Sequence, residues 1–263
     1  MKWIEVDGVT LRYEMSGEGD EVLILIHHMG GTLESWAEIL PKLNKTRRVL
    51  RFDMRGAGLS EKIRGAAEID VLASDISALL DALGITGKVC AVGIAIGGAV
   101  AIRFAARFGE RVSSLVVTSP ATGIPVERRP RTLKLADNIE QQGIRTLADE
   151  IMTRTYPVAL RSDPKAFDDA RSQLISNDPA SLAAFYRMLA HLEMEEDFPK
   201  VTCATLVFAG SHDEVRPPST VEKLALSLPN ARFQVIESGH IMSIQTPALL
   251  ATQINGFLGG LKS

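Results

Sequence analysis

Apolar residues follow two alternating patterns along most of this chain. Short, nearly continuous apolar runs, of which Glu21–His27 is the clearest, are typical of strands buried on both faces. Between them lie segments whose apolar positions recur mostly every three or four residues, as on one face of a helix. In the clearest such segment these positions are Ile69, Leu72, Ile76, Leu79, Leu80 and Leu83, and Gly84 follows as a stop signal.

The order of these patterns predicts the fold class. An opening hairpin, Trp3–Val6 and Thr10–Met15 around Asp7-Gly8, precedes a regular alternation of strands and helices. Further strands are expected at Arg48–Asp53, Lys88–Gly93, Ser114–Ser119, Thr205–Ala209 and Arg232–Ile236, and further helices at Trp36–Leu43, Ile96–Phe108, Thr220–Leu228 and Pro247–Leu258. This alternation predicts an α/β fold with a mostly parallel, twisted sheet and helices on both faces.

One stretch departs from the alternation. Residues 121–200 contain helical patterns and no convincing strand. Asp163-Pro164 and Asp178-Pro179 each place a capping acid before a proline at the first helical position, and Gly143 separates two other helical segments. We expect residues 121–200 to form a helical lid over the strand ends, with residues 1–120 and 201–263 as the core.

Composition narrows the range of partners. The 263 residues are 46% hydrophobic and 23% charged, with a net charge of −3 and no basic stripe, so no nucleic-acid partner is expected. The longest apolar run, Val22–Ile26, is too short to cross a membrane, and the first residues lack an apolar signal core. Cys90 and Cys203 are expected as buried free thiols within strands, consistent with a cytoplasmic protein.

The most informative motif is Gly93-Ile94-Ala95-Ile96-Gly97-Gly98, which lies between an expected strand and an expected helix. This is the context of the nucleophile elbow G-x-S-x-G, in which glycines let the helix and the strand pack closely around a strained residue. Ala95 stands where the motif has serine. Because alanine has no oxygen to attack a substrate, the motif predicts a hydrolase scaffold that lacks its nucleophile.

A second motif, Ile26-His27-His28-Met29-Gly30-Gly31, ends another buried strand. In a hydrolase of this kind the turn supplies one backbone N–H to the oxyanion hole, and the residue after the nucleophile supplies the other. We therefore assign these donors to Met29 and Ile96, and place His28 and Gly30 in the substrate pocket. A plain glycine turn is the alternative interpretation of this motif.

Two later loops offer an acid and a base. Asp213, in Gly210-Ser211-His212-Asp213-Glu214, can orient an imidazole through its Nδ1–H, with Glu214 as the competitor. His240 follows the last strand and is the expected general base. An acid can also follow the preceding strand in this fold, but that position has Thr118-Ser119-Pro120 and no carboxylate. The order of nucleophile, acid and histidine is that of α/β-hydrolases.

These motifs, with the stretch Arg51-Phe52-Asp53-Met54-Arg55-Gly56-Ala57-Gly58-Leu59-Ser60, resemble the α/β-hydrolase superfamily over nearly the whole chain. Within it, the length, the Arg51–Gly56 stretch and the short lid are most similar to the 3-oxoadipate enol-lactonase group and its carbon–carbon-hydrolase relatives. Besides Ala95, two departures are His28, where the family commonly has the glycine of H-G, and Ala57, where a histidine is frequent. The resemblance favours a small carboxylated or lactone substrate.

Three explanations account for a chain with acid, base and oxyanion donors but no nucleophile. The simplest is a Ser→Ala substitution in a serine hydrolase that cleaves an ester or lactone through an acyl-enzyme. The second is a natural pseudo-hydrolase that binds a ligand without catalysis. The third is carbon–carbon-hydrolase or lyase-like chemistry that uses the histidine as base. In each case the expected partner is a small molecule, with no metal and no cofactor; a homodimer is left open.

Overall fold

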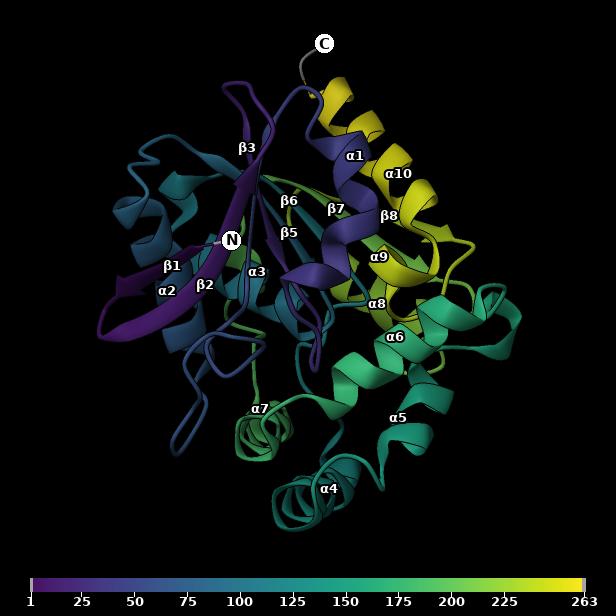
Figure 1. The fold of residues 1–263 in the computed structure, drawn as a ribbon. Coiled ribbons are helices and arrows are strands. Elements are labelled where there is room, and N and C mark those ends of the chain that lie inside the picture. The colour runs from purple at the N-terminus through teal and green to yellow at the C-terminus, as the bar shows by residue number, and fades with distance from the viewer. Residues whose placement is uncertain (1, 262–263) are drawn as a thin grey trace.

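A computed structural model describes residues 2–261 of the chain (Figure 1). Its centre is an eight-stranded sheet in the order β1-β2-β4-β3-β5-β6-β7-β8. The strands are β1 (Lys2–Val6), β2 (Val9–Ser16), β3 (Val22–Ile26), β4 (Arg48–Phe52), β5 (Val89–Ile94), β6 (Val112–Thr118), β7 (Ala204–Gly210) and β8 (Ala231–Ile236). Strands β3 to β8 are parallel, whereas β2 pairs antiparallel with both β1 and β4. The predicted fold class is therefore confirmed.

Helices cover both faces of the sheet, because strands that are apolar on both faces need two covering layers. On one side α2 packs beside α3, and elsewhere α1 packs beside α10. The helices outside the β6–β7 connection are α1 (Leu40–Leu43), α2 (Ile69–Ala82), α3 (Ile96–Arg107), α8 (Pro218–Leu226), α9 (Met242–Gln245) and α10 (Pro247–Gly260). Within residues 2–261, no helix has both the length and the apolar character needed to cross a bilayer.

The ends of the strands agree with the sequence to within two residues. The hairpin turn has Asp7 at φ 46° and Gly8 at φ 73°, which is the backbone of a type I′ turn. The helical segment expected at Trp36–Leu43 is present as a 3₁₀ helix over Leu33–Ile39 followed by the short α1. Pro41 lies in the first turn of α1, a position where a proline is tolerated because its missing N–H would have no helical partner.

The connection from β6 to β7 is helical, and we call residues 121–200 the insertion. It contains α4 (Arg129–Gln142), α5 (Ala148–Thr155), α6 (Pro164–Ile175) and α7 (Pro179–His191). The side chains of Asp163 and Asp178 cap α6 and α7, as predicted from their Asp-Pro pairs, and Gly143 ends α4 at φ 78°. The insertion has its own small apolar cluster, which includes Ala136, Ile139, Met152, Leu174 and Leu182.

The two cysteines were both expected to be buried within strands, and the structure confirms this for Cys90 but not for Cys203. Cys90 lies in β5 and is fully buried, but Cys203 precedes β7 and is only half-buried. Both are free thiols. Burial raises the pKa of the Cys90 thiol to about 12, so this side chain is an inert core residue at neutral pH. Met1 and residues 262–263, which the sequence assigned to the core, lie outside the described residues.

Candidate active site

Ala95 forms a sharp junction between the central strand β5 and helix α3. Its backbone has φ 51° and ψ −113°, a conformation that is strained for a residue with a Cβ atom. The strain is held by neighbouring backbone: the Ala95 N–H donates to the Thr118 carbonyl at 3.0 Å, and the Ala121 N–H donates to the Ala95 carbonyl at 2.9 Å. The predicted elbow geometry is thus present with alanine at its apex.

The glycines around Ala95 allow this close approach. A Cβ atom on Gly97 would lie 2.3 Å from the Ile26 carbonyl oxygen of β3. That distance is far shorter than a real contact, so the first turn of α3 can meet the end of β3 only with glycine at this position. The elbow and the loop after β3 are therefore fixed against each other by backbone contact.

Asp213 and His240 are brought together by the loops that follow β7 and β8. His240 Nδ1 lies 2.9 Å from Asp213 Oδ2, and both side chains are buried. The other carboxylate oxygen, Oδ1, accepts from the N–H groups of Val215 and Arg216, each at 2.9 Å. Burial acts to raise the pKa of Asp213, but the hydrogen bond and charge of His240, together with the Ser119 side chain and the Arg216 N–H, hold this pKa below its ordinary value.

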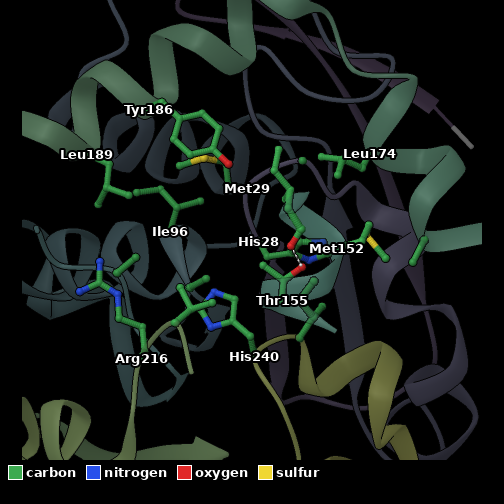
Figure 2. Close-up of a pocket in the computed structure, with 17 residues that line it drawn as sticks. His28, Met29, Ile96, Met152, Thr155, Leu174, Tyr186, Leu189, Arg216 and His240 are labelled. Atoms are coloured by element: carbon green, nitrogen blue, oxygen red, sulfur yellow. Dashed lines mark hydrogen bonds between the residues drawn. The ribbon is translucent and has the colours of Figure 1, made fainter. Parts of the chain in front are cut away.

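Because Asp213 is ionised, it determines which ring nitrogen of His240 carries the proton. Nδ1 must donate to the carboxylate, so in the neutral ring Nε2 carries the lone pair. Nε2 has no hydrogen-bond partner within residues 2–261, and His240 lines the same cavity as Ala95 (Figure 2). The competing acid, Glu214, is exposed and makes no contact with His240. The arrangement provides a base, oriented by a buried acid, beside the elbow.

The loop after β3 contains two histidines with different surroundings. His27 Nε2 lies 3.0 Å from the Met54 N–H, and its Nδ1 lies 2.8 Å from the His28 carbonyl oxygen. Because the Met54 N–H can only donate, His27 accepts at Nε2 and donates from Nδ1, which makes it a neutral ring that ties two loops together. Burial accordingly lowers the pKa of His27.

His28 instead lines the cavity beside Ala95 and His240. Burial, followed by the neighbouring imidazoles of His27 and His240, lowers the pKa of His28 to about 3. Its Nδ1 is buried without a hydrogen-bond partner in the described chain. His28 is therefore an uncharged ring at neutral pH.

The two residues that the sequence assigned as oxyanion donors both lie at the cavity. Met29 and Ile96 both line the cavity, as does Gly30. Within the described residues, neither the Met29 N–H nor the Ile96 N–H has a hydrogen-bond partner. Ile96 is the first residue of α3, so its free N–H also lies at the positive end of the helix dipole.

The cavity between these groups has a volume of about 120 Å³. Its remaining wall is largely apolar and comes mostly from the insertion, with Ile151, Met152, Thr155, Ala170, Leu174, Tyr186 and Leu189. Figure 2 shows Leu189 and Arg216 on one side of the cavity and Met152 and Leu174 on the other. None of the insertion residues was predicted from the sequence, because their placement depends on how four helices pack.

Over residues 21–247 the sequence matches the family model described as alpha/beta hydrolase fold. The chain belongs to the α/β-hydrolase fold family. Most of the elements that position the elbow, the acid and the histidine lie within this match.

Curated relatives and solved structures of α/β-hydrolases resemble the chain over nearly its full length. It is 26% identical to 3-oxoadipate enol-lactonase 2 of Acinetobacter baylyi over 241 residues, which cover 91% of this chain and 89% of the relative. A malate-bound thermophilic esterase from Thermogutta terrifontis superposes with a TM-score of 0.93 at 26% identity, covering 100% of both chains. The enol-lactonase of Burkholderia xenovorans gives a TM-score of 0.91 at 26% identity, covering 98% of this chain and 100% of that one.

The stretch that resembles the family around Asp53 has a structural role in this α/β-hydrolase. Asp53 is fully buried and accepts from the N–H groups of Leu33 at 2.7 Å and Leu59 at 2.8 Å, and from Arg12 at 3.2 Å. The Ser60 hydroxyl donates to the Asp53 carbonyl oxygen at 2.7 Å. These bonds fix the loop after β4, which carries the Met54 N–H that orients His27.

Proposed function

We propose that this chain carries the machinery of a serine hydrolase for small esters or lactones, with alanine in place of the nucleophile. The observation that carries the proposal is the buried pair of His240 Nδ1 and Asp213 Oδ2, which lie 2.9 Å apart. The imidazole of this pair lines the same cavity as the elbow residue Ala95. The similar proteins support a hydrolytic reaction, since they include an enol-lactonase and an esterase.

The roles of the residues follow from a serine placed at position 95. His240 Nε2 would take the hydroxyl proton while Asp213 stabilises the resulting imidazolium, and the serine oxygen would attack the carbonyl carbon. The N–H groups of Met29 and Ile96 would hold the negative oxygen of the tetrahedral intermediate. His240 would then protonate the leaving oxygen and activate water to release the acid. In the chain as it stands, the first of these steps has no nucleophile.

Substrate would be held between the core and the insertion. We assign the insertion the role of a lid, because its side chains form most of the apolar wall of the cavity. A cavity of about 120 Å³ suits a short acyl group or a small lactone ring. We place His28 and Gly30 on the side of the substrate next to the oxyanion donors.

The experiment that tests this proposal restores the missing oxygen. Ala95→Ser and the unaltered chain are assayed on p-nitrophenyl esters, enol-lactones and meta-cleavage dienoates. We expect Ala95→Ser to raise the rate by about 10³- to 10⁶-fold on an ester or lactone, with a rate that increases as His240 loses its proton. Equal turnover by both forms would contradict the role given to position 95. A folded but inert Ala95→Ser protein that still binds these esters would favour the pseudo-hydrolase.

One observation favours a second candidate, base catalysis by His240 without a covalent step. His240 lines the cavity, and its Nε2 has no hydrogen-bond partner in the described residues, so this nitrogen can remove a proton from bound water or from carbon. This candidate requires activity in the unaltered chain that His240→Gln abolishes and Ala95→Ser leaves unchanged.

A further inference from the structure

Arg216 occupies an unusual position beside the candidate active site. It lies three residues after Asp213, is half-buried, and borders the cavity that contains Ala95 and His240. Figure 2 shows its guanidinium group on the Leu189 side of the cavity, turned away from the imidazole of His240. One of its nitrogens, Nη2, donates to the Gly123 carbonyl oxygen at 2.6 Å.

No carboxylate within residues 2–261 lies within ion-pair distance of this guanidinium. Of the two acids just before it in the chain, Glu214 is exposed and forms no ion pair with Arg216. Asp213 already uses one oxygen for His240 and the other for two backbone N–H groups. A half-buried arginine is normally paired, because removing its charge from water is costly. Burial lowers the pKa of Arg216 below its ordinary value, and the charge of Asp213 only partly opposes this. The guanidinium nonetheless stays protonated at neutral pH.

A second cavity, of about 160 Å³, adjoins the first. Six residues border both: Ile151, Thr155, Tyr186, Leu189, Val215 and Arg216. The second cavity is also lined by Arg128 and Arg154, which are exposed and have no ion-pair partner in the described chain. Its one acidic residue, Glu150, is paired with Arg131 at 3.2 Å. The field in this cavity is therefore positive.

Several other arginines of the insertion pair with acids of the chain. Arg129 pairs with Glu193, and Arg187 pairs with Asp137 and Glu140. Arg128, Arg154 and Arg216 all line the second cavity and have no ion-pair partner in the described chain. Arg145 and Arg161 also lack a carboxylate partner, but they line neither cavity.

From this arrangement we propose that Arg216 binds a carboxylate of the substrate, which lies several bonds away from the carbonyl group beside Ala95. The proposal rests on the proposed function for the position of that carbonyl. The expected substrates are therefore monoesters of dicarboxylic acids and lactones with a carboxylate side chain. Arg128 and Arg154 at the mouth of the second cavity attract the anion, and Arg216 holds it where a planar guanidinium can form two parallel hydrogen bonds.

The unaltered chain makes a direct binding test possible, because it lacks the proposed nucleophile. Monomethyl esters of succinic, glutaric and adipic acid are titrated calorimetrically against the matching dimethyl esters, which are larger by one methyl group and have no charge. We expect the monomethyl esters to bind about 10- to 100-fold more tightly, with one chain length preferred. Because Arg216 is half-buried, this preference should persist at high salt.

Three variants show whether Arg216 is responsible. Arg216→Gln should abolish the preference for the monomethyl ester while the dimethyl ester binds as before, and Arg216→Lys should retain part of it. Arg187→Gln removes the same charge from an arginine that already has acidic partners and should retain the full preference. Equal binding of the two ester series to the unaltered chain, or an unchanged preference in Arg216→Gln, would overturn the proposal.

The same ligands separate this proposal from the proposed function. If Ala95→Ser hydrolyses the monomethyl and dimethyl esters equally well, the hydrolase proposal stands and the carboxylate site is refuted. If Ala95→Ser is inert on every ester and lactone but the unaltered chain binds monomethyl esters through Arg216, the carboxylate site stands and the hydrolase proposal fails.

Discussion

A Cβ atom on Gly93 would lie 2.2 Å from the carbonyl oxygen of Gly97, across the turn that carries Ala95. Gly93 is the second-to-last residue of β5, and Gly97 lies in the first turn of α3. Backbone therefore packs on backbone here, and no side-chain movement can make room for a methyl group.

We expect Gly93→Ala to lower the free energy of unfolding by about 3 kcal/mol or more, because the clash forces strand and helix apart. Urea unfolding measures the change. The control is Gly109→Ala, where a Cβ atom would have no neighbour within 4 Å. Equal stability of the two variants would show that the elbow relaxes easily, contrary to this description.

Asp213→Asn tests how the acid orients His240. The Val215 and Arg216 N–H groups require an acceptor, so the asparagine oxygen should take the place of Oδ1 and its NH₂ group should face His240. His240 Nδ1 would then accept, which leaves the proton on Nε2 and no lone pair for a serine. In the Ala95→Ser background we expect kcat to fall on the order of 10⁴-fold.

The matched control for this exchange is Glu214→Gln in the same background. Glu214 is the neighbouring acid, but it is exposed and does not contact the imidazole. The kcat of the protein with both Ala95→Ser and Glu214→Gln should stay within a factor of about two of that of the Ala95→Ser protein, since surface charges act weakly. A loss in Glu214→Gln comparable with that in Asp213→Asn would mean that the acid has been identified wrongly.

His28 should make the protein sensitive to acid. Its pKa is lowered from 6.5 to about 3 in the folded chain, whereas the unfolded chain has the ordinary value. Between these two pH values the unfolded chain binds more protons, so the free energy of unfolding falls as the pH falls. The contribution of one such group is about 1.4 kcal/mol per pH unit.

We therefore expect His28→Gln to flatten the decline of stability between pH 6.5 and about 3, with no such effect above pH 6.5. Chemical denaturation at a series of pH values gives the slope directly. A residual slope will remain, because burial also lowers the pKa of His27. Parallel curves of unfolding free energy against pH for the two proteins would show that His28 takes up its proton at the same pH in the folded chain as in the unfolded chain.

Asp53→Asn should destabilise the loop that supports His27. The substitution removes the negative charge that Arg12 pairs with at 3.2 Å and replaces one of two acceptors for buried N–H groups by a donor. We expect a loss of about 3 kcal/mol in the free energy of unfolding, measured with urea. Asp81→Asn, at an exposed ion pair with Arg111, should cost less than about 1 kcal/mol.

Much of the core could be predicted from the sequence because local rules decide it. Strands that are apolar on both faces and helices with a single apolar stripe each have one compatible environment, which is why β3 and α2 were found. The loop positions of Ala95, Asp213 and His240 could also be assigned, because motif spacing and chain order place them after particular strands. Their catalytic roles remain proposals.

The remainder depends on contacts between segments far apart in sequence. The wall of the cavity comes from helices whose polar and apolar residues look like those of any surface helix, so nothing in the sequence marked Met152 and Leu189 as cavity residues. Arg216 could have been noticed from its place three residues after Asp213. However, only the three-dimensional structure shows that no carboxylate of the described chain pairs with Arg216.

The insertion is also the crossover connection between two parallel, hydrogen-bonded strands, β6 and β7. Met29 and Ala95 come before it in the chain, and Asp213 and His240 come after it. Joining the two halves closes a long loop, which is an entropically slow step in folding. A chain that stalls at this step contains the elbow but neither the acid nor the histidine beside it, so tight ligand binding reports that the whole sheet has assembled.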